Sequence, residues 1–183
     1  MTDEELLAGA RKRNAGAFKM LVKRYESLVA GTVIGMLGHC PEAEDVGQNT
    51  FIRFYNALDS FKGESGVGTF LTRIAINLSL NEIKRRKRNL FLFPDGAIDE
   101  IDNIAESANH VDFEMKIVVQ RALQCLKPEY RAVVILRLIH GYSTEETAKA
   151  LDIPPGTALS RLYRARDKLK KMLYKTIGAG HGQ

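Results

Sequence analysis

The sequence has little of what secreted, metal-binding or membrane proteins need. Its 183 residues contain two cysteines and no tryptophan. Cys40 and Cys125 are far apart and form no Cys-x-x-Cys pattern, so we expect reduced cysteines and no bound metal or cofactor. No apolar run approaches the ~18 residues of a membrane-spanning helix, and the segment from Met1 to Glu5 lacks the basic start of a signal peptide. We therefore expect a cytoplasmic protein without membrane insertion.

The chain is basic, but one segment carries acidic residues without any Lys or Arg. Residues 89–115 contain seven Asp or Glu and no Lys or Arg, so in a chain of net charge +5 the other residues carry +12. The positive flanks favour a polyanionic partner such as nucleic acid. Helical periodicity is lost over residues 89–110, which is typical of an interdomain linker.

Apolar residues recur at spacings of three and four along most of the chain, and no alternating strand pattern stands out. We expect an all-α protein of two small helical domains, residues 1–88 and 111–183, joined by a flexible acidic linker at residues 89–110. The predicted helices cover residues 15–37, 41 to about 58, about 70–88, 111–126, 128–140, 143–151 and 155–174.

A helix-turn-helix is predicted from Ser143 to about Lys171. Ser143 and Glu146 form a capping-box signature directly after Gly141, which is suited to ending the preceding helix. Pro154-Pro155-Gly156 interrupts the chain, and two helices joined by so short a break cross steeply. The outward side of the second helix carries side chains that can bond bases and phosphates in a major groove. The predicted DNA-binding residues are Ser143, Thr157, Ser160, Arg161, Tyr163, Arg164 and Lys168.

The N-terminal half contains a glycine-rich stretch, residues 62–68, that predicts a loop. Opening a DNA duplex costs a few kcal/mol per unstacked base, and a pocket of aromatic and polar groups that captures a flipped base compensates for it. Phe61, Phe70 and Asn77 near this loop could supply such a pocket, and the basic run Lys84–Arg88 a phosphate track. Core packing is the alternative for the aromatic rings, and Phe61 is the better functional candidate among them.

Two motifs, one in each half, belong together. The first contains Ala43-Glu44-Asp45-Val46-Gly47-Gln48-Asn49-Thr50-Phe51 and continues through residues 57–77. The second contains Gly141-Tyr142-Ser143-Thr144-Glu145-Glu146 and Ile153-Pro154-Pro155-Gly156-Thr157. They closely resemble region 2 and region 4 of the extracytoplasmic-function (ECF, group 4) sigma factors of the sigma-70 family, in the family's order and over nearly the whole chain.

The resemblance implies a protein without catalytic activity that directs core RNA polymerase to promoters. Region 2 would bind the clamp helices of the largest polymerase subunit and the −10 element. Region 4 would bind the −35 element and the flap of the second subunit. An anti-sigma factor is a further implied partner. The implied polymerase-binding residues are Asp45, Gln48, Asn49, Phe51, Ile52 and Arg53. The implied −10-binding residues are Phe61, Lys62, Gly63, Ser65, Phe70, Arg73, Asn77, Lys84 and Arg85.

The length of the linker bears on this function. The resemblance implies promoter elements about 17 base pairs apart, or roughly 58 Å at about 3.4 Å per pair. The segment 89–110 spans roughly 73 Å fully extended but averages only about 26 Å as a flexible coil. The polymerase would therefore have to hold the two domains apart.

Two other functions are open to the residues alone. A stand-alone helix-turn-helix repressor or activator would explain the second motif but not the first. Such a regulator would be a stable dimer that binds DNA by itself, whereas a sigma factor would be monomeric and depend on core polymerase. A nucleic-acid-processing enzyme is disfavoured, because the acidic residues form no metal-binding signature and no Gly-x-x-x-x-Gly-Lys loop occurs.

Overall fold

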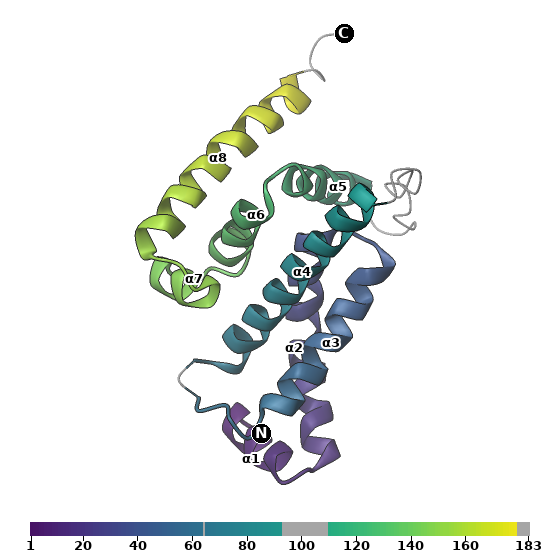
Figure 1. Cartoon of the computed structure of the whole chain (residues 1–183), viewed down its shortest axis with the longest axis vertical. Helices are drawn as coiled ribbons and strands as arrows, with labels where there is room; N and C mark the ends of the chain where they lie inside the picture. Colours follow the sequence, from purple (N-terminus) through teal and green to yellow (C-terminus); the bar gives the residue numbers. More distant parts are fainter. Residues whose placement is uncertain (64, 93–109, 179–183) are drawn as a thin grey trace.

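The computed structural model describes residues 1–63, 65–92 and 110–178, and all regular secondary structure in these ranges is helical. The all-α prediction is confirmed. None of the described helices is long and apolar enough to cross a membrane. The N-terminal unit contains α1 (Asp3–Arg11), α2 (Ala15–Leu37), α3 (Pro41–Ala57) and α4 (Val67–Leu92). The C-terminal unit contains α5 (His110–Gln124), α6 (Pro128–Val134), the π-helix η2 (Ile135–Ile139), α7 (Thr144–Leu151) and α8 (Pro155–Gly178) (Figure 1).

The first two helices begin at side-chain caps. The Thr2 hydroxyl accepts a hydrogen bond from the Glu5 amide, and the Glu5 carboxylate accepts one from the Thr2 amide. Asn14 caps α2 through a 3.1 Å hydrogen bond from the Ala17 amide. Both caps satisfy amides that the first helical turn leaves unpaired. Helix α2 has the predicted bounds, whereas α1 is absent from the helices predicted from the sequence.

The core of the N-terminal unit lies between α2, α3 and α4, which run alongside one another (Figure 1). Phe54 of α3 and Leu71 and Ile76 of α4 are completely buried there. Burial of a side chain of this size contributes about 1.5–3 kcal/mol. This packing fixes α3 and α4, which carry most of the predicted region 2 residues, relative to each other.

Helix α4 extends further than predicted. The predicted helix ends at Arg88, whereas the structure continues the helix to Leu92. No proline or glycine lies between these positions to break the hydrogen-bond ladder. The rest of the predicted linker up to residue 109 lies outside the described residues.

The C-terminal unit is built around the inner side of α8, which packs on α6 and α7 through Leu162 and Ala165. Between α6 and α7 the chain forms a π turn, in which the His140 amide donates to the Ile135 carbonyl at 2.9 Å. This turn replaces the last part of the α-helix predicted over residues 128–140. Gly141 follows it with a φ of 71°, a conformation that favours glycine.

The two units pack directly against each other along the C-terminal half of α2. Ile135 lies over Gly35, where an added Cβ would be 2.9 Å from the Ile135 Cδ1 atom. Gln120 and Gln124 of α5 donate hydrogen bonds to the carbonyls of Ile34 and Gly35, at 2.6 and 3.2 Å. Buried side chains of both units consequently form one hydrophobic cluster.

Polar side chains complete this contact between the units. The Thr32 hydroxyl of α2 lies 2.8 Å from His140 Nε2, and the Tyr142 hydroxyl donates to Thr72 Oγ1 at 3.3 Å. Thr72 belongs to α4, and Tyr142 directly precedes Ser143, the N-cap residue of α7. The packing therefore brings the start of α7 against α4.

Candidate nucleic-acid interface

Helices α7 and α8 form the predicted helix-turn-helix. The Ser143 hydroxyl accepts a hydrogen bond from the Glu146 amide at 3.0 Å, and the Glu146 carboxylate accepts one from the Ser143 amide at 2.7 Å. This is the predicted capping box, and its hydrogen bonds lower the pKa of Glu146. Asp152 makes the turn in the left-handed conformation, with a φ of 54°. Helix α8 begins at Pro155, so Gly156 lies within its first turn rather than in the break.

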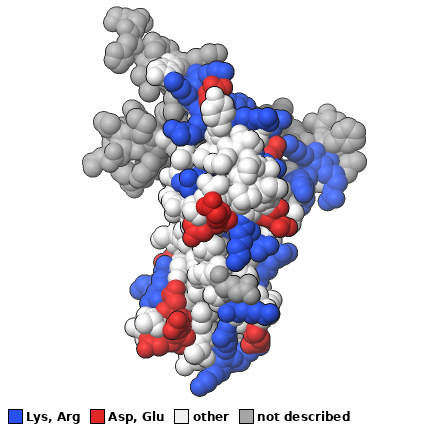
Figure 2. Space-filling model, turned by 90° about the vertical axis from the view of Figure 1, so that its left-hand side faces the viewer, with Lys and Arg blue, Asp and Glu red and all other residues white. Residues whose placement is uncertain are grey.

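The two sides of α8 differ as the periodicity predicts. Ala158 and Leu162 face the core, whereas Ser160, Tyr163 and Arg164 on the other side are exposed, with 77% of Tyr163 accessible. Figure 2 shows Lys and Arg atoms around the upper end of the molecule, where α8 approaches the C-terminus, and further groups of them below. The outward side of α8 thus combines hydrogen-bonding groups with positive charge.

Three of the predicted −35 residues already have partners within the protein, and one of them is Ser160, whose hydroxyl donates to the Thr157 carbonyl of its own helix at 3.0 Å. Ser143 is engaged as the cap of α7. The Lys168 ammonium donates a 2.7 Å hydrogen bond to the Cys125 carbonyl, just after the end of α5. Arg161 is half-buried and Arg164 exposed, and neither forms a hydrogen bond or ion pair within the described residues. Their guanidinium groups are therefore the ones available to bases.

A polar stripe runs along the exposed side of α4. Arg73, Asn77 and Lys84 are all exposed and share one face of the helix, because they are spaced by four and seven residues. Arg88 continues the stripe by one further turn. Three of these four side chains are cationic, which suits the path of a phosphate backbone.

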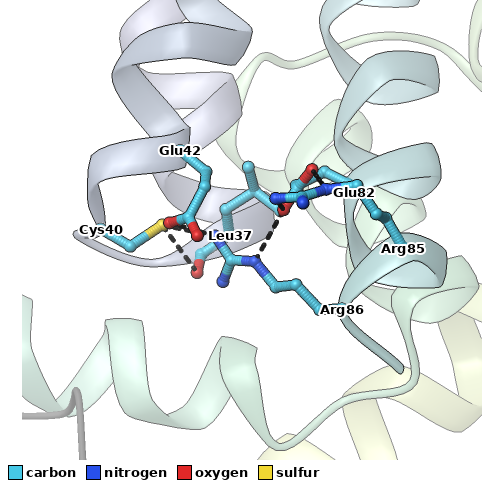
Figure 3. A network of polar contacts seen from close by, with 6 residues as sticks. All are labelled: Leu37, Cys40, Glu42, Glu82, Arg85 and Arg86. Carbon is cyan, nitrogen blue, oxygen red and sulfur yellow. Dashed lines mark hydrogen bonds and ion pairs between the residues drawn. The ribbon is translucent and has the colours of Figure 1, made fainter. Parts of the chain in front are cut away.

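The basic run at the end of α4 is only partly available to DNA. In Figure 3, Arg85 and Arg86 both reach Glu82, which accepts two hydrogen bonds from Arg85 at 2.8 and 2.9 Å. Arg86 also donates to Glu42 at 3.0 Å and to the Cys40 sulfur at 2.9 Å, and so ties the start of α3 to α4. The hydrogen bond from Arg85 lowers the pKa of Glu82. Arg85 would have to leave Glu82 to contact a phosphate.

The aromatic residues before and within α4 form a cluster in the core. Only 6% of Phe61 is accessible, and its ring centroid lies 4.8 Å from that of Phe70 and 6.3 Å from that of Phe54. Phe70 is half-buried at the edge of this cluster. The exposed residues next to Phe61 are Lys62 and Gly63, and Gly63 has a φ of 73°. The structure therefore places the predicted base-capturing ring of Phe61 in the core.

The predicted polymerase-binding residues lie along α3. Phe51 and Ile52 line an apolar groove of about 440 Å³ between α2 and α3, together with Phe18, Tyr55 and Arg13. The sequence indicates which of these side chains are apolar but not that two helices leave a groove between them. Phe51 is half-buried, and the exposed members of the predicted set are Asp45, Gln48, Asn49, Ile52 and Arg53.

One residue at this interface was not predicted. Arg11 of α1 donates hydrogen bonds to the carbonyls of Leu58, at 3.1 Å, and of Phe61. The Phe61 carbonyl immediately precedes the exposed residues Lys62 and Gly63. The sequence does contain a signal for α1, since Thr2 and Glu5 have the same spacing as the capping box of α7.

Comparisons with known proteins agree with this arrangement. Residues 21–89 match the family model of Sigma-70 region 2, and residues 116–169 match that of Sigma-70, region 4. The chain is 32% identical to the RNA polymerase sigma-H factor of Pseudomonas aeruginosa over 93% of each chain. It is 33% identical to the ECF RNA polymerase sigma-E factor of Salmonella typhimurium over 97% of each. The chain belongs to the extracytoplasmic-function sigma factors of the sigma-70 family.

A solved structure of a relative covers both units of this sigma factor. The sigma factor RpoE in complex with the anti-sigma factor NepR, from Bartonella quintana, aligns with a TM-score of 0.70 and 27% identity. The alignment covers 85% of this chain and 96% of that one. Because the similarity includes region 2 as well as the helix-turn-helix, the protein is an RNA polymerase sigma factor rather than a stand-alone regulator.

Proposed function

We propose that this sigma factor binds promoter DNA at two separate points. Residues 1–88 bind core polymerase and the −10 element, residues 111–183 bind the −35 element, and residues 89–110 link them. The observation that carries the proposal is the pair of exposed helix faces on α4 and α8, which combine hydrogen-bonding and cationic side chains. The face on α4 lies in the segment that matches Sigma-70 region 2, and the face on α8 lies in the segment that matches Sigma-70, region 4.

The −35 element binds the outward side of α8. Arg161 and Arg164 can each donate two hydrogen bonds to O6 and N7 of guanine in a major groove. Thr157, Ser160 and Tyr163 supply hydroxyl groups for bases or phosphates. Lys168 adds charge beside the duplex while it holds the end of α5. Ser143 acts by orienting the start of α7.

The −10 element binds along α4 and the exposed residues that precede it. Arg73 and Asn77 contact the separated strand, and Lys84 follows its phosphates. Lys62 and Gly63 approach the strand closely, since neither is covered by the core. Contacts of this kind compensate for the few kcal/mol that each unstacked base costs.

Core polymerase binds the exposed side of α3. The apolar groove beside Phe51 and Ile52 accepts apolar side chains of the clamp helices, and the polar residues Asp45, Gln48 and Asn49 surround that contact. An amphipathic helix placed in an apolar groove is a common mode of recognition. Region 4 binds the flap of the second subunit.

The packed arrangement of the two units opens when a promoter is bound. Tyr142, next to the cap of α7, lies 3.3 Å from Thr72, next to Arg73. The promoter elements that the two units bind are about 58 Å apart. The polymerase therefore separates the units, and an anti-sigma factor keeps them together, as a relative was solved bound to one.

The setting of the protein follows from these partners. We place it in the cytoplasm, where polymerase and promoter DNA are found. It has no cofactor and no catalytic activity of its own, because the polymerase forms the bonds of the transcript.

Transcription from a genomic library with purified core polymerase tests the proposed function. The wild-type protein should direct initiation at a small set of promoters, and core polymerase alone should give no specific start sites. Sequencing of the transcript ends identifies the promoters and their −10 and −35 elements. A folded protein that produces no specific start site would refute the proposal.

The contact between the units should weaken in acid because of His140. Burial lowers the pKa of His140 below its ordinary value of 6.5, while the ring contacts the Thr32 hydroxyl at 2.8 Å and lies near the Tyr142 ring. The packed form therefore binds fewer protons than the open form. Its stability is fully present above pH 6.5 and is lost as the pH falls through the lowered pKa.

The radius of gyration from small-angle X-ray scattering measures this change. It should increase in the wild type as the pH falls below about 6.5. His140→Gln keeps a hydrogen-bonding partner for Thr32 but cannot titrate, so its radius should change less. Equal pH profiles for the two proteins would show that His140 does not control the contact.

A further inference from the structure

Helix α1 holds the chain at the point where it leaves α3. Arg11 is the last residue of α1, and its Nε donates to the Leu58 carbonyl at 3.1 Å while its Nη2 donates to the Phe61 carbonyl. The helix itself is fixed, because Leu6 and Leu7 are buried and the Thr2 capping box closes its first turn. Arg11 is therefore presented from a rigid support.

The Leu58 carbonyl needs such a partner. Leu58 follows the last turn of α3, where the final carbonyls of a helix have no amide of their own helix to accept. A guanidinium group carries several donors in one plane and can satisfy two acceptors at once, and a positive charge is stabilised at the C-terminal end of a helix. Arg11 thus fixes the backbone on both sides of Asp59 and Ser60.

The constrained segment leads straight to residues exposed to solvent. Phe61 is held on its other side by the contact of its ring with Phe70, at 4.8 Å between centroids. Lys62 and Gly63 follow without any covering side chain from the core. The chain therefore passes from the buried Phe61 to the exposed Lys62 within one residue.

We propose that Arg11 is a positioning residue for recognition of the −10 element. By fixing the Leu58 and Phe61 carbonyls, it sets the direction in which Lys62 and Gly63 project toward the separated DNA strand. The inference rests on the proposed function, which assigns −10 binding to these two residues. Without Arg11, this short segment would have to be ordered when DNA binds, and that ordering lowers affinity.

A neighbouring lysine provides a matched control. Lys12 directly follows Arg11 and is exposed, and its side chain forms no hydrogen bond or ion pair within the described residues. Lys12→Ala removes the same charge from the same turn but leaves both carbonyls bonded to Arg11.

A second control addresses the docking of α1 as a whole. Arg24 of α2 pairs with Asp3 at the opposite end of α1, at 2.5 Å. Arg24→Ala therefore loosens the helix without touching the segment before Lys62. If α1 contributes only by packing against the other helices, Arg24→Ala and Arg11→Ala should weaken binding of the −10 strand to a similar extent.

The experiment uses holoenzyme reconstituted from core polymerase and each variant. One probe is a labelled single strand that copies the non-template −10 sequence of a promoter found by the transcription experiment, and the other is a duplex with its −35 element. We expect Arg11→Ala and Arg11→Gln to weaken binding of the −10 strand about 10-fold, or about 1.4 kcal/mol. Binding of the −35 duplex should stay within about twofold, as should binding of both probes with Lys12→Ala and Arg24→Ala.

The outcomes distinguish a failure of the role proposed for Arg11 from a failure of the proposed −10 binding. Binding of the −10 strand by Arg11→Gln at the wild-type level overturns the role of Arg11, as does an equal loss with Arg24→Ala. If wild-type holoenzyme prefers the −10 strand no more than a scrambled strand, the assignment of −10 binding itself fails. Circular dichroism of each variant shows whether a loss of binding reflects unfolding.

Discussion

We expect the replacement of Arg131 by alanine to lower the free energy of unfolding by about 3 kcal/mol. Arg131 of α6 is 6% exposed, and its guanidinium group joins three helices. It donates to the carbonyls of Gln124 and Leu126 at the end of α5, at 2.7 and 3.1 Å, and to the Met36 carbonyl near the end of α2. Alanine would leave these buried carbonyls without a donor.

The size of this loss of stability follows from the positive charge of the Arg131 guanidinium group. Burial lowers the pKa of Arg131 to about 10, so the group is still charged at neutral pH. Its acceptors lie at helix C-termini, where the helix dipole stabilises positive charge. Hydrogen bonds from a charged donor contribute about 1.5–3 kcal/mol each, and unpaired buried acceptors cost about 1–3 kcal/mol.

Urea unfolding followed by circular dichroism measures this loss. Arg131→Lys keeps the charge but lacks the planar fork, so it should fall between alanine and wild type. Arg121→Ala is the control, because Arg121 is exposed on the neighbouring α5 and its removal should change stability by less than about 0.5 kcal/mol. A value for Arg131→Ala close to that control would contradict the bridging role.

Local signals in the sequence were sufficient for much of the fold. Helix α2 has the predicted bounds because its apolar spacing is regular over its whole length. The start of α7 was predicted because Ser143 and Glu146 form a capping box that depends only on residues three apart. The same pair at Thr2 and Glu5 marks α1 equally well, so the sequence contains the start signal of this helix although the helix was not predicted.

Features that depend on contacts between distant residues could not be predicted in this way. Apolar spacing shows that Ile135 is buried but not that it packs on Gly35 of the other unit. It also does not show whether an aromatic ring beside a loop faces solvent or core, which is why Phe61 was considered for base capture. The sequence also does not show whether a polar side chain is free to bind DNA. Lys168 and Arg85, for example, form hydrogen bonds with Cys125 and Glu82 of the same chain.

The outward side of α8 could be predicted because its residues are defined by one helix alone. Ser160 and Arg164 are one turn apart, and both are exposed opposite the buried Leu162. A face of this kind is specified by helical geometry and needs no knowledge of other units. It is therefore the part of the site for which a base-specific test is best defined.

Replacement of Arg164 by alanine should reduce discrimination between the correct −35 element and a mutated one by about 1–3 kcal/mol. Arg164 is exposed on the outward side of α8 and forms no ion pair within the described residues, so its donors are available to a guanine edge. Competition binding of holoenzyme to the two duplexes measures the ratio of affinities. That ratio, rather than the affinity for one sequence, separates base contact from general attraction.

Arg166→Ala is the matched control for this test. Arg166 is also exposed and lies two residues further along α8, so it projects from another side of the helix. Its removal subtracts the same charge and should weaken binding to both duplexes equally, because attraction to phosphates does not depend on sequence. If Arg164→Ala also weakened both duplexes equally, with the ratio unchanged, Arg164 would contact only phosphates, and base reading would have to come from Arg161 and its neighbours.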